Sequence, residues 1–334
     1  MSTQPIDNAM LKMPISLPVH NVKLRPFRTD EDFALIASIK RRCLQADRVL
    51  RLPTRSSIAN AFASLGGFQP ARDVMIAMQD DKPVGYVRLH AHQDGDGRTL
   101  LQHRCYTLPR MRHSGLSEHL LAYAEGRLLS RVIDLDSRNM VILTSDAYET
   151  EVEKWGLLER SGYRIATTYD DMVCDLGLIS PPEHPASGWD VRPVQLSHRE
   201  DILAWLQTIE GDALHPIEAN LWRREMQQSP LLWWTLLHDD HIVGCAICRV
   251  DRQENMTLGR RRTYIDRIVF DPACHGNGGE EFFIASLLWH LKRLGLREAV
   301  CRVNPDHPVC GHQRLAGLGF RRIARYSSYW KSLN

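Results

Sequence analysis

The sequence has no long hydrophobic run and no strong excess of either charge. No apolar stretch among its 334 residues reaches the length of roughly 18 that a membrane-spanning helix needs. Residues 1–19 lack the basic start and the apolar segment of a signal peptide. Lys and Arg number 42 against 40 Asp and Glu, so no basic excess is available to cover a polyanion. The sequence therefore does not favour a nucleic-acid partner, and we expect a cytoplasmic protein with no membrane partner.

The sequence also lacks a cysteine pattern typical of a metal site. Its eight cysteines are scattered, several of them within apolar runs, which is typical of reduced, buried thiols. The one close pair is Cys245 and Cys248, in the run IVGCAICRV. If this run is a strand, side chains three positions apart lie on opposite faces and cannot bind one metal ion. We expect no bound metal.

Two common nucleotide-binding motifs are missing as well. No G-x-G-x-x-G follows a first strand, and no G-K-[ST] occurs. These absences argue against a Rossmann domain and a P-loop domain. The composition, 43% hydrophobic and 25% charged, is that of an ordinary globular protein, and the length fits two domains.

One pattern of elements occurs twice along the chain. Residues 25–26 and 192–193 are both Arg-Pro, and each pair belongs to a strand followed by an acidic helix start. Residues 84–85 and 243–244 are both Val-Gly, and each follows an Asp-Asp step between alternating runs, as in a β-hairpin. The order of these landmarks is the same in both halves.

Two further landmarks complete the repeat. Residues 106–129 and 268–295 each give a strand, a tight loop with glycine and a long helix, while 157–165 and 314–323 each give a helix end, a Gly turn and a last strand. The offsets between the four pairs of landmarks lie between 157 and 167 residues. Nearly constant offsets indicate a duplication.

The duplication predicts two domains of one mixed α/β topology, each ordered β-α(α)-ββ-β-α-β-α-β. The stretch GLISPPEHPASG is rich in proline and small residues, which is typical of a domain boundary. We expect an N-terminal arm over 1–19, a first domain over 20–178, a linker over 179–187 and a second domain over 188–334.

The loop before each long helix is the strongest functional signal. A helix that begins after a polar, Gly-bearing loop presents unpaired N–H groups and the positive end of its dipole, which suits a phosphate group. The loop reads Arg112-x-x-Gly115-x-Ser117 in the first domain and His275-x-x-Gly278-x-Glu280 in the second. Together with the other landmarks, these loops resemble the [Gln/Arg]-x-x-Gly-x-[Gly/Ala] signature of the GCN5-related N-acetyltransferases (GNAT family).

The resemblance implies two tandem GNAT domains that use acetyl-CoA as acyl donor and bind its pyrophosphate at these loops. Ser117 replaces the usual Gly or Ala, and the second loop departs from the signature at both ends. Glu280 and Glu281 suit a bare helix N-terminus but would repel a pyrophosphate, so we expect the first loop to be the better site. The residues expected to bind the coenzyme are Thr107, Leu108, Arg112, His113, Ser114, Gly115, Leu116, Ser117, His275, Gly276, Asn277, Gly278 and Gly279.

The resemblance also implies a base on the fourth strand of a domain. His103 and Asp266 lie on the fourth strands, on the face expected to line the cleft. The alternatives are a half-buried structural histidine and an ion pair of Asp266 with a nearby arginine. Leu158 and Leu315 stand where the family commonly has a tyrosine acid, so Tyr148, after the fifth strand, is our substitute acid.

The resemblance implies an acetyl-CoA-dependent N-acetyltransferase, which we expect to act on the primary amine of a small molecule by direct attack on the thioester. One alternative acceptor is a protein lysine. A different class of function is a degenerate tandem that binds CoA or a partner protein without catalysis, and the altered second loop favours it. A homodimer is compatible with any of these functions.

Overall fold

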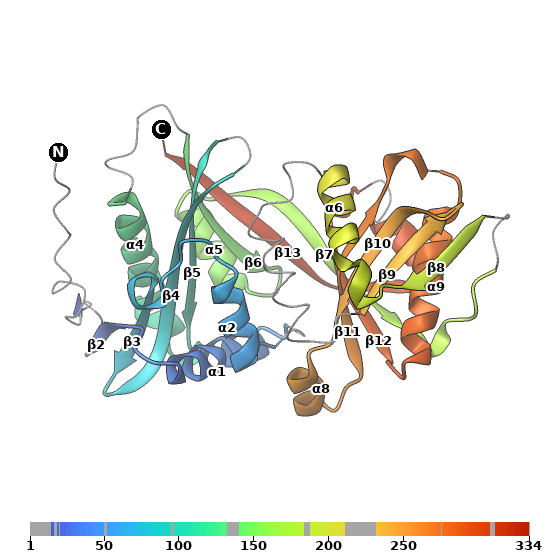
Figure 1. The fold of residues 1–334 in the computed structure, drawn as a ribbon. Helices are drawn as coiled ribbons and strands as arrows, with labels where there is room; N and C mark the ends of the chain where they lie inside the picture. The colour runs from blue at the N-terminus through green and yellow to red at the C-terminus, as the bar shows by residue number, and fades with distance from the viewer. Residues whose placement is uncertain are drawn as a thin grey trace. The chain divides into compact units, whose positions relative to one another are not determined.

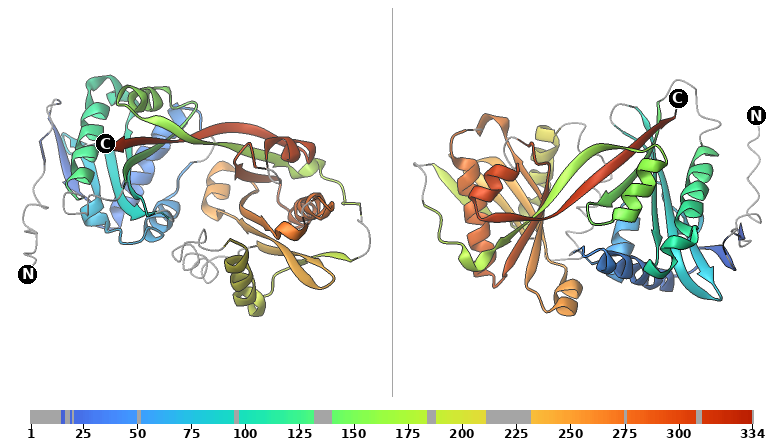
Figure 2. Two further views of the ribbon diagram at one scale, coloured as in Figure 1. Left: turned by 90° about the horizontal axis from the view of Figure 1, so that it is seen from above. Right: turned by 180° about the vertical axis from the view of Figure 1, so that it is seen from behind.

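The computed structural model describes residues 15–16, 19, 21–49, 52–94, 97–131, 140–183, 188–210, 232–274, 276–307 and 311–333. Two compact units divide the chain (Figure 1). The first unit holds Met1–Thr167 and Ser327–Asn334, and the second holds Thr168–Tyr326. Two long strands, β7 (Arg164–Asp175) and β13 (Phe320–Leu333), therefore have one end in each unit (Figure 2).

The first unit is built on a mixed sheet in which β1 to β6 lie in sequence order and β13 follows β6. The pairs from β1 to β5 are antiparallel, whereas β5 and β6 are parallel. Its elements are β1 (Ile15–Ser16), β2 (Val22–Pro26), α1 (Glu31–Ala46), α2 (Arg55–Ala63), α3 (Pro70–Asp73), β3 (Val74–Gln79), β4 (Lys82–Gln93), β5 (Thr99–Thr107), η2 (Pro109–Ser114), α4 (Leu116–Leu129), β6 (Val141–Tyr148) and α5 (Val152–Arg160).

Helices cover both faces of this sheet. Alternation along β4 and β5 sends Val87, Leu89 and Leu101 to one face, where they share an apolar core with the leucines of α4. On the opposite face, Lys40 of α1 lies against the ring of Tyr106. Side chains of β5 therefore alternate between the α4 side and the α1 side, and this alternation decides which of them reach the site.

The second unit repeats this plan. Its strands follow the order β7-β12-β11-β10-β9-β8, with β11 and β12 as the parallel pair. Its elements are η3 (Leu176–Leu178), β8 (Trp189–Pro193), η4 (Leu196–His198), α6 (Arg199–Glu210), β9 (Leu232–His238), β10 (His241–Arg249), α8 (Arg252–Leu258), β11 (Arg262–Phe270), η6 (Pro272–Cys274), α9 (Gly279–Arg293), β12 (Glu298–Val303) and α10 (His312–Gly317).

The predicted hairpins match in detail. Residues 80–81 and 239–240 are Asp-Asp pairs with φ between 47° and 62°, as a two-residue type I′ turn requires. Val84 and Val243 are each skipped in the pairing of β4 and β10 and form a bulge. Each bulge carbonyl accepts the N–H of a residue near the end of the next strand, Leu108 and Asp271. The internal duplication is confirmed at the level of single residues.

The units do not divide the chain at the expected linker. Residues 179–183 and 188 of the linker region lie within the second unit, between η3 and β8. The units divide instead at 167/168 and 326/327, because each unit contains part of both long strands. The expected domains over 20–178 and 188–334, with a linker over 179–187 between them, stay a prediction.

Candidate active site

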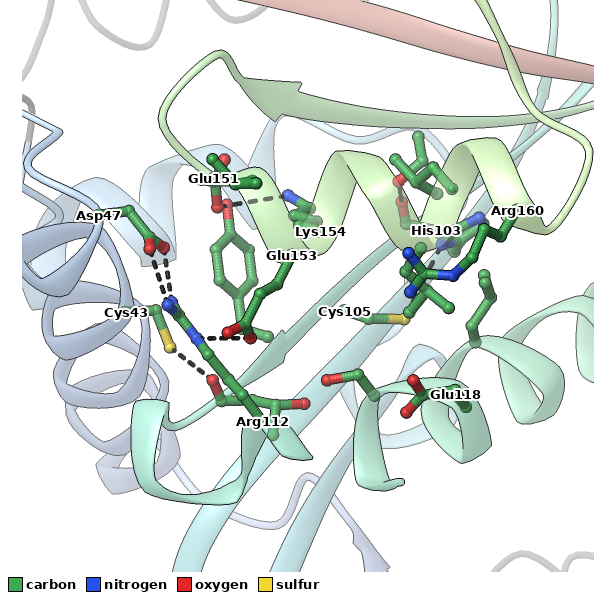
Figure 3. A pocket seen from close by; sticks show the side chains of 18 of the residues that line it. Cys43, Asp47, His103, Cys105, Arg112, Glu118, Glu151, Glu153, Lys154 and Arg160 are labelled. Carbon is green, nitrogen blue, oxygen red and sulfur yellow. Dashed lines mark hydrogen bonds and ion pairs between the residues drawn. The ribbon is translucent and has the colours of Figure 1, made fainter. Parts of the chain in front are cut away.

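A cavity of about 360 Å³ lies in the first unit, where β5 and β6 separate (Figure 3). The two strands are in register over only four pairs, from Thr99↔Val141 to Gln102↔Thr144, and both continue beyond the last pair. The gap between the diverging strands is lined by Cys43, Asp47, His103, Cys105, Tyr106, Thr107, Arg112, His113, Ser117, Glu118, Leu121, Ser145, Glu151, Val152, Glu153, Lys154, Leu157, Leu158 and Arg160.

The predicted coenzyme loop forms one end of the lining. The 3₁₀ turn η2 leads to Gly115, whose φ of 82° is left-handed, and α4 begins at Leu116. The first N–H groups of a helix have no intrahelical acceptor, so the N–H groups of Ser117 and Glu118 are available for an anion at the positive end of α4. The geometry fits a phosphate group. Glu118, which the sequence analysis did not name, also lines the cavity and adds a carboxylate near this helix start.

Arg112 is held in place by α1. Its guanidinium donates to both carboxylate oxygens of Asp47 at 2.8 and 2.6 Å, and Glu153 lies 3.6 Å away (Figure 3). Although burial opposes its charge, these carboxylates raise the pKa of Arg112. Since its charge is already compensated, Arg112 fixes the loop against α1, and a phosphate would meet mainly backbone N–H groups there.

The other predicted coenzyme residues of the first unit differ in what they expose. Thr107 and His113 line the cavity, and the Thr107 carbonyl accepts a hydrogen bond from the Cys43 thiol at 3.2 Å. Leu108 and Leu116 are buried, so only their backbones are available to a ligand. Ser114 turns its hydroxyl back to the carbonyl of Met111 in η2. Coenzyme binding by these residues stays a prediction.

His103 lines the cavity although it is only 1% exposed. Its Nε2 atom is 2.8 Å from the hydroxyl of Tyr163, and its Nδ1 atom is 3.8 Å from the sulfur of Cys105. Burial, and then the nearby Lys154 ammonium, lower the pKa of His103 to about 3. The ordinary pKa of a histidine is 6.5, and the difference arises because burial takes the imidazole out of contact with water.

The end of β6 carries a charged cluster. Asp146 forms ion pairs with Arg104 and with Lys154, which is 3.5 Å away, and these cations hold its pKa well below the usual range despite burial. Tyr148, our substitute acid, is buried and does not line this cavity. Its N–H donates to the Glu151 carboxylate at 2.9 Å, and burial raises the pKa of that carboxyl.

Several lining residues were missed by sequence reasoning. The Lys154 ammonium lies 4.4 Å from the centre of the Tyr106 ring and 3.8 Å from Glu151. Cys43 lies in the C-terminal part of α1, and Asp47 is the residue directly after this helix. No local motif marks these positions, because α1, β5 and α5 bring them together only in the folded chain.

In the second unit, Asp266 is paired with Arg249 at 2.8 and 3.1 Å, on an exposed part of β11. The alternative to a catalytic base for Asp266 was an ion pair with a nearby arginine. An ion pair is present, and its partner is Arg249 of β10, not an arginine next to Asp266 in the sequence. Gly278 has a φ of 77°, like Gly115, but the buried Glu280 carboxylate follows it and is paired with Arg314 at 2.9 Å. Gly276 and Asn277 are exposed, and His275 lies outside the described residues.

The comparisons with known proteins agree with the duplication. The model of the acetyltransferase (GNAT) family matches residues 44–145 and again 199–310. A GCN5-related N-acetyltransferase from Sphaerobacter thermophilus is similar in structure, with a TM-score of 0.75 at 18% identity, over 95% of this chain and 97% of that one. A tandem GNAT protein from the clavulanic acid biosynthesis pathway has a TM-score of 0.67 at 15% identity, over 93% and 98%.

A third similar structure is a glucosamine N-acetyltransferase region of a fungal multi-domain β-N-acetylglucosaminidase, with a TM-score of 0.66 at 14% identity. It is matched over 94% of this chain and 38% of that chain. No curated protein matches the sequence. Within the described ranges, no helix is long and apolar enough to cross a membrane.

Proposed function

The chain belongs to the GNAT acetyltransferase family, and we propose that its first unit transfers an acetyl group from acetyl-CoA to the primary amine of a small molecule in the cytoplasm. The observation that carries the proposal is that one cavity is lined both by the loop ending in the left-handed Gly115 and by His103 on β5. Coenzyme loop and candidate base thus face one space, as acyl transfer within a single unit requires.

The donor would lie along the gap between β5 and β6. Its pyrophosphate would accept hydrogen bonds from the N-terminal N–H groups of α4. Its extended, amide-containing arm would run along β5 beyond Gln102, where the ladder with β6 ends and β5 can pair with a chain that has amide groups. The thioester would then lie in the cavity that His103 lines.

The acceptor would attack the thioester directly. The enzyme must hold the amine against the carbonyl carbon and remove one proton as the new C–N bond forms. The cavity wall carries the carboxylates of Glu151 and Glu153 beside the cations Lys154 and Arg112, so it offers hydrogen-bond acceptors and donors to a polar amine. A small acceptor is our choice because the cavity volume of about 360 Å³ is at the lower end for ligand sites.

A second candidate function is coenzyme binding without catalysis. It is favoured by two observations: the low pKa of His103, which makes an isolated imidazole a weak base, and Leu158 at the position of the family's tyrosine acid. An intact first loop alone does not distinguish the two functions.

One experiment separates them. Calorimetry with acetyl-CoA measures donor binding, and release of free thiol is then followed with a panel of primary amines, with a lysine-containing peptide as a further acceptor. We expect binding together with thiol release that depends on a small amine. Binding without amine-dependent release would favour the non-catalytic function, and release only with the peptide would favour a protein acceptor.

A further inference from the structure

A chain of hydrogen bonds leads from the cavity toward the edge of the first unit. His103 Nε2 lies 2.8 Å from Tyr163 Oη, and that hydroxyl lies 2.9 Å from Glu125 Oε1. The Lys331 ammonium donates to both oxygens of Glu125 at 3.1 and 3.2 Å. His103 and Tyr163 are buried, whereas the side chains of Glu125 and Lys331 are 20% and 28% exposed. The chain thus joins the buried wall of the cavity to half-buried charges.

The partners fix the direction of every bond in the chain. The Glu125 carboxylate beside Lys331 can only accept, so the hydroxyl of Tyr163 donates to it. The oxygen of Tyr163 then accepts from His103, which places the imidazole proton on Nε2. The lone pair is therefore on Nδ1, the nitrogen near Cys105, whose side chain also lines the cavity. His103 is thereby set to accept a proton on Nδ1.

Burial makes a charged His103 costly, which an isolated base would have to overcome. The low pKa of His103 comes first from burial and then from Lys154, with Lys331 and Arg88 as further cations and Asp146 as the opposing carboxylate. A relay avoids this cost because the imidazole gives up its Nε2 proton as it gains one on Nδ1. Tyr163 and Cys105 are the groups that contact the His103 ring. The charged groups near enough to act on its pKa are Lys154, Asp146, Lys331 and Arg88.

We propose that His103, Tyr163 and Glu125 form a proton relay that serves the acetyl transfer as base and then as acid, a role that rests on the proposed function. As the amine attacks the thioester carbon, its N–H proton moves to Nδ1 of His103, the Nε2 proton moves to Tyr163, and the Tyr163 proton moves to Glu125. When the C–S bond breaks, the same shifts run backward and Nδ1 returns a proton to the departing thiolate. The products are the amide and free CoA thiol.

This relay gives a physical account of Leu158. A side chain that donates the last proton is not needed where the family commonly has a tyrosine, because His103 returns the proton it received. Tyr163 and Glu125 do not touch the substrate in this scheme. They act through His103 as positioning residues. The Glu125 carboxylate beside Lys331 holds the proton until the C–S bond breaks.

The first test does not need activity. Nitrogen NMR of labelled histidine in the full chain should show His103 protonated on Nε2 and unprotonated on Nδ1 between about pH 5 and 8. Over this range the imidazole is neutral, because its pKa is about 3. In Tyr163→Phe, which removes the acceptor oxygen, the two neutral tautomers should mix. A wild-type His103 that is protonated on Nδ1 overturns the relay, whatever the enzyme acetylates.

The second test measures turnover. Tyr163→Phe and Glu125→Gln should each lower kcat by about 10²-fold or more, the range of general acid–base catalysis, while the dissociation constant of acetyl-CoA stays unchanged. Glu125→Asp should recover part of the rate. Rates in mixtures of light and heavy water should curve for the wild type, as several moving protons require, and become linear in Tyr163→Phe.

A matched control is Tyr329→Phe, which removes a hydroxyl from another buried tyrosine of the same core. It should leave kcat and the solvent isotope effect as they are in the wild type. A wild-type rate in Tyr163→Phe, or an equal loss in Tyr329→Phe, overturns the relay. A wild type that binds acetyl-CoA but acetylates no amine instead refutes the proposed function, and the tautomer measurement still decides the hydrogen-bond chain.

Discussion

The indole of Trp189 fills the space that a Cβ atom on Gly279 would occupy. In the first unit the corresponding positions of the repeat are Val22 and Leu116, both fully buried in the core. Where the first unit has Val22 and Leu116, the second unit has Trp189 and Gly279. The larger side chain at 189 thus fills the volume that the missing side chain at 279 leaves. The absent side chain of Gly279 is therefore explained by packing against β8.

This exchange predicts a coupled effect on stability. Gly279→Ala should destabilise the protein by about 1–3 kcal/mol, the usual cost of overpacking a filled core. Trp189→Leu should create a cavity and destabilise as well. The smaller side chain of Trp189→Leu makes room for the methyl group that Gly279→Ala adds, and that methyl group fills part of the cavity. The double variant should therefore lose clearly less free energy of unfolding than the sum of the two single losses. Denaturant unfolding of the wild type, the two single variants and the double variant measures this. Additive losses would contradict the packing account.

The two loops predict unequal effects on coenzyme affinity. Gly115→Glu places a carboxylate and a strained left-handed residue at the N-terminus of α4 and should weaken acetyl-CoA binding at least tenfold, about 1.4 kcal/mol. Gly278→Glu is the matched control, since its φ of 77° is close to the 82° of Gly115. It should matter less, because Glu280 and Arg314 already occupy the second helix start. Calorimetry should also find one coenzyme per chain, and equal effects of the two changes would contradict the choice of the first unit.

Lys40 predicts a pH dependence of stability. Burial first, and then the cations Arg104, Lys154 and Arg88, lower the pKa of Lys40 to about 7 from its ordinary value of 10.5. Between these values the unfolded chain binds the extra proton, so the contribution of Lys40 to stability rises with pH from 7 to 10.5, and below pH 7 its penalty is fully present.

Replacing this lysine should remove the penalty. At about pH 6, below the pKa of about 7, Lys40→Met should raise the melting temperature by about 2–4 °C or more. It should also flatten the increase of the melting temperature toward about pH 9. Lys82→Met, at an exposed hairpin position, is the control and should change neither. Thermal unfolding at several pH values measures both, and a destabilised Lys40→Met at pH 6 would contradict the assignment.

The shared strands predict the outcome of cutting the chain. Limited proteolysis should cut first within about 177–188, where proline and small residues leave little to bury. The C-terminal fragment then still contains residues 327–334, which belong to the first unit. We expect the fragments to elute together in size-exclusion chromatography without denaturant.

A chain truncated at residue 178 supplies the matching test. It lacks Tyr329, which is part of the first unit's core, and Lys331, which pairs with Glu125. Circular dichroism should show a much less stable first unit than in the full chain. A truncated chain as stable as the full protein, or fragments that separate at once, would contradict the unit boundaries found here.

Local patterns were sufficient to predict much of the fold. The Asp-Asp hairpins and the loops with glycine before α4 and α9 follow from residue types at fixed spacing, since turn geometry depends on the residues in it. The bulges at Val84 and Val243 and the left-handed backbone of Gly115 and Gly278 are details that only the structure shows. The division of β7 and β13 between units could not be predicted in this way. Strand partners are chosen by contacts between distant residues, and an internal repeat does not say which copy receives the last strand.

The site was predicted in part for the same reason. The coenzyme loop carries a motif, and His103 was found from its position on the fourth strand. Its partner Tyr163 lies 60 residues further along the chain, and Asp47 lies 65 residues from Arg112. Contacts at such separations leave no local signal, so the low pKa of His103 and the compensated charge of Arg112 appear only in the folded chain.

The measurement that tests the central claim most directly is amine-dependent release of thiol from acetyl-CoA by the wild type, Gly115→Glu and Gly278→Glu side by side. The account predicts that the wild type and Gly278→Glu release thiol with a small primary amine, and that Gly115→Glu at subsaturating acetyl-CoA is at least tenfold slower, following its loss of affinity. Release that survives in Gly115→Glu and disappears in Gly278→Glu would contradict the account and place the reaction in the second unit.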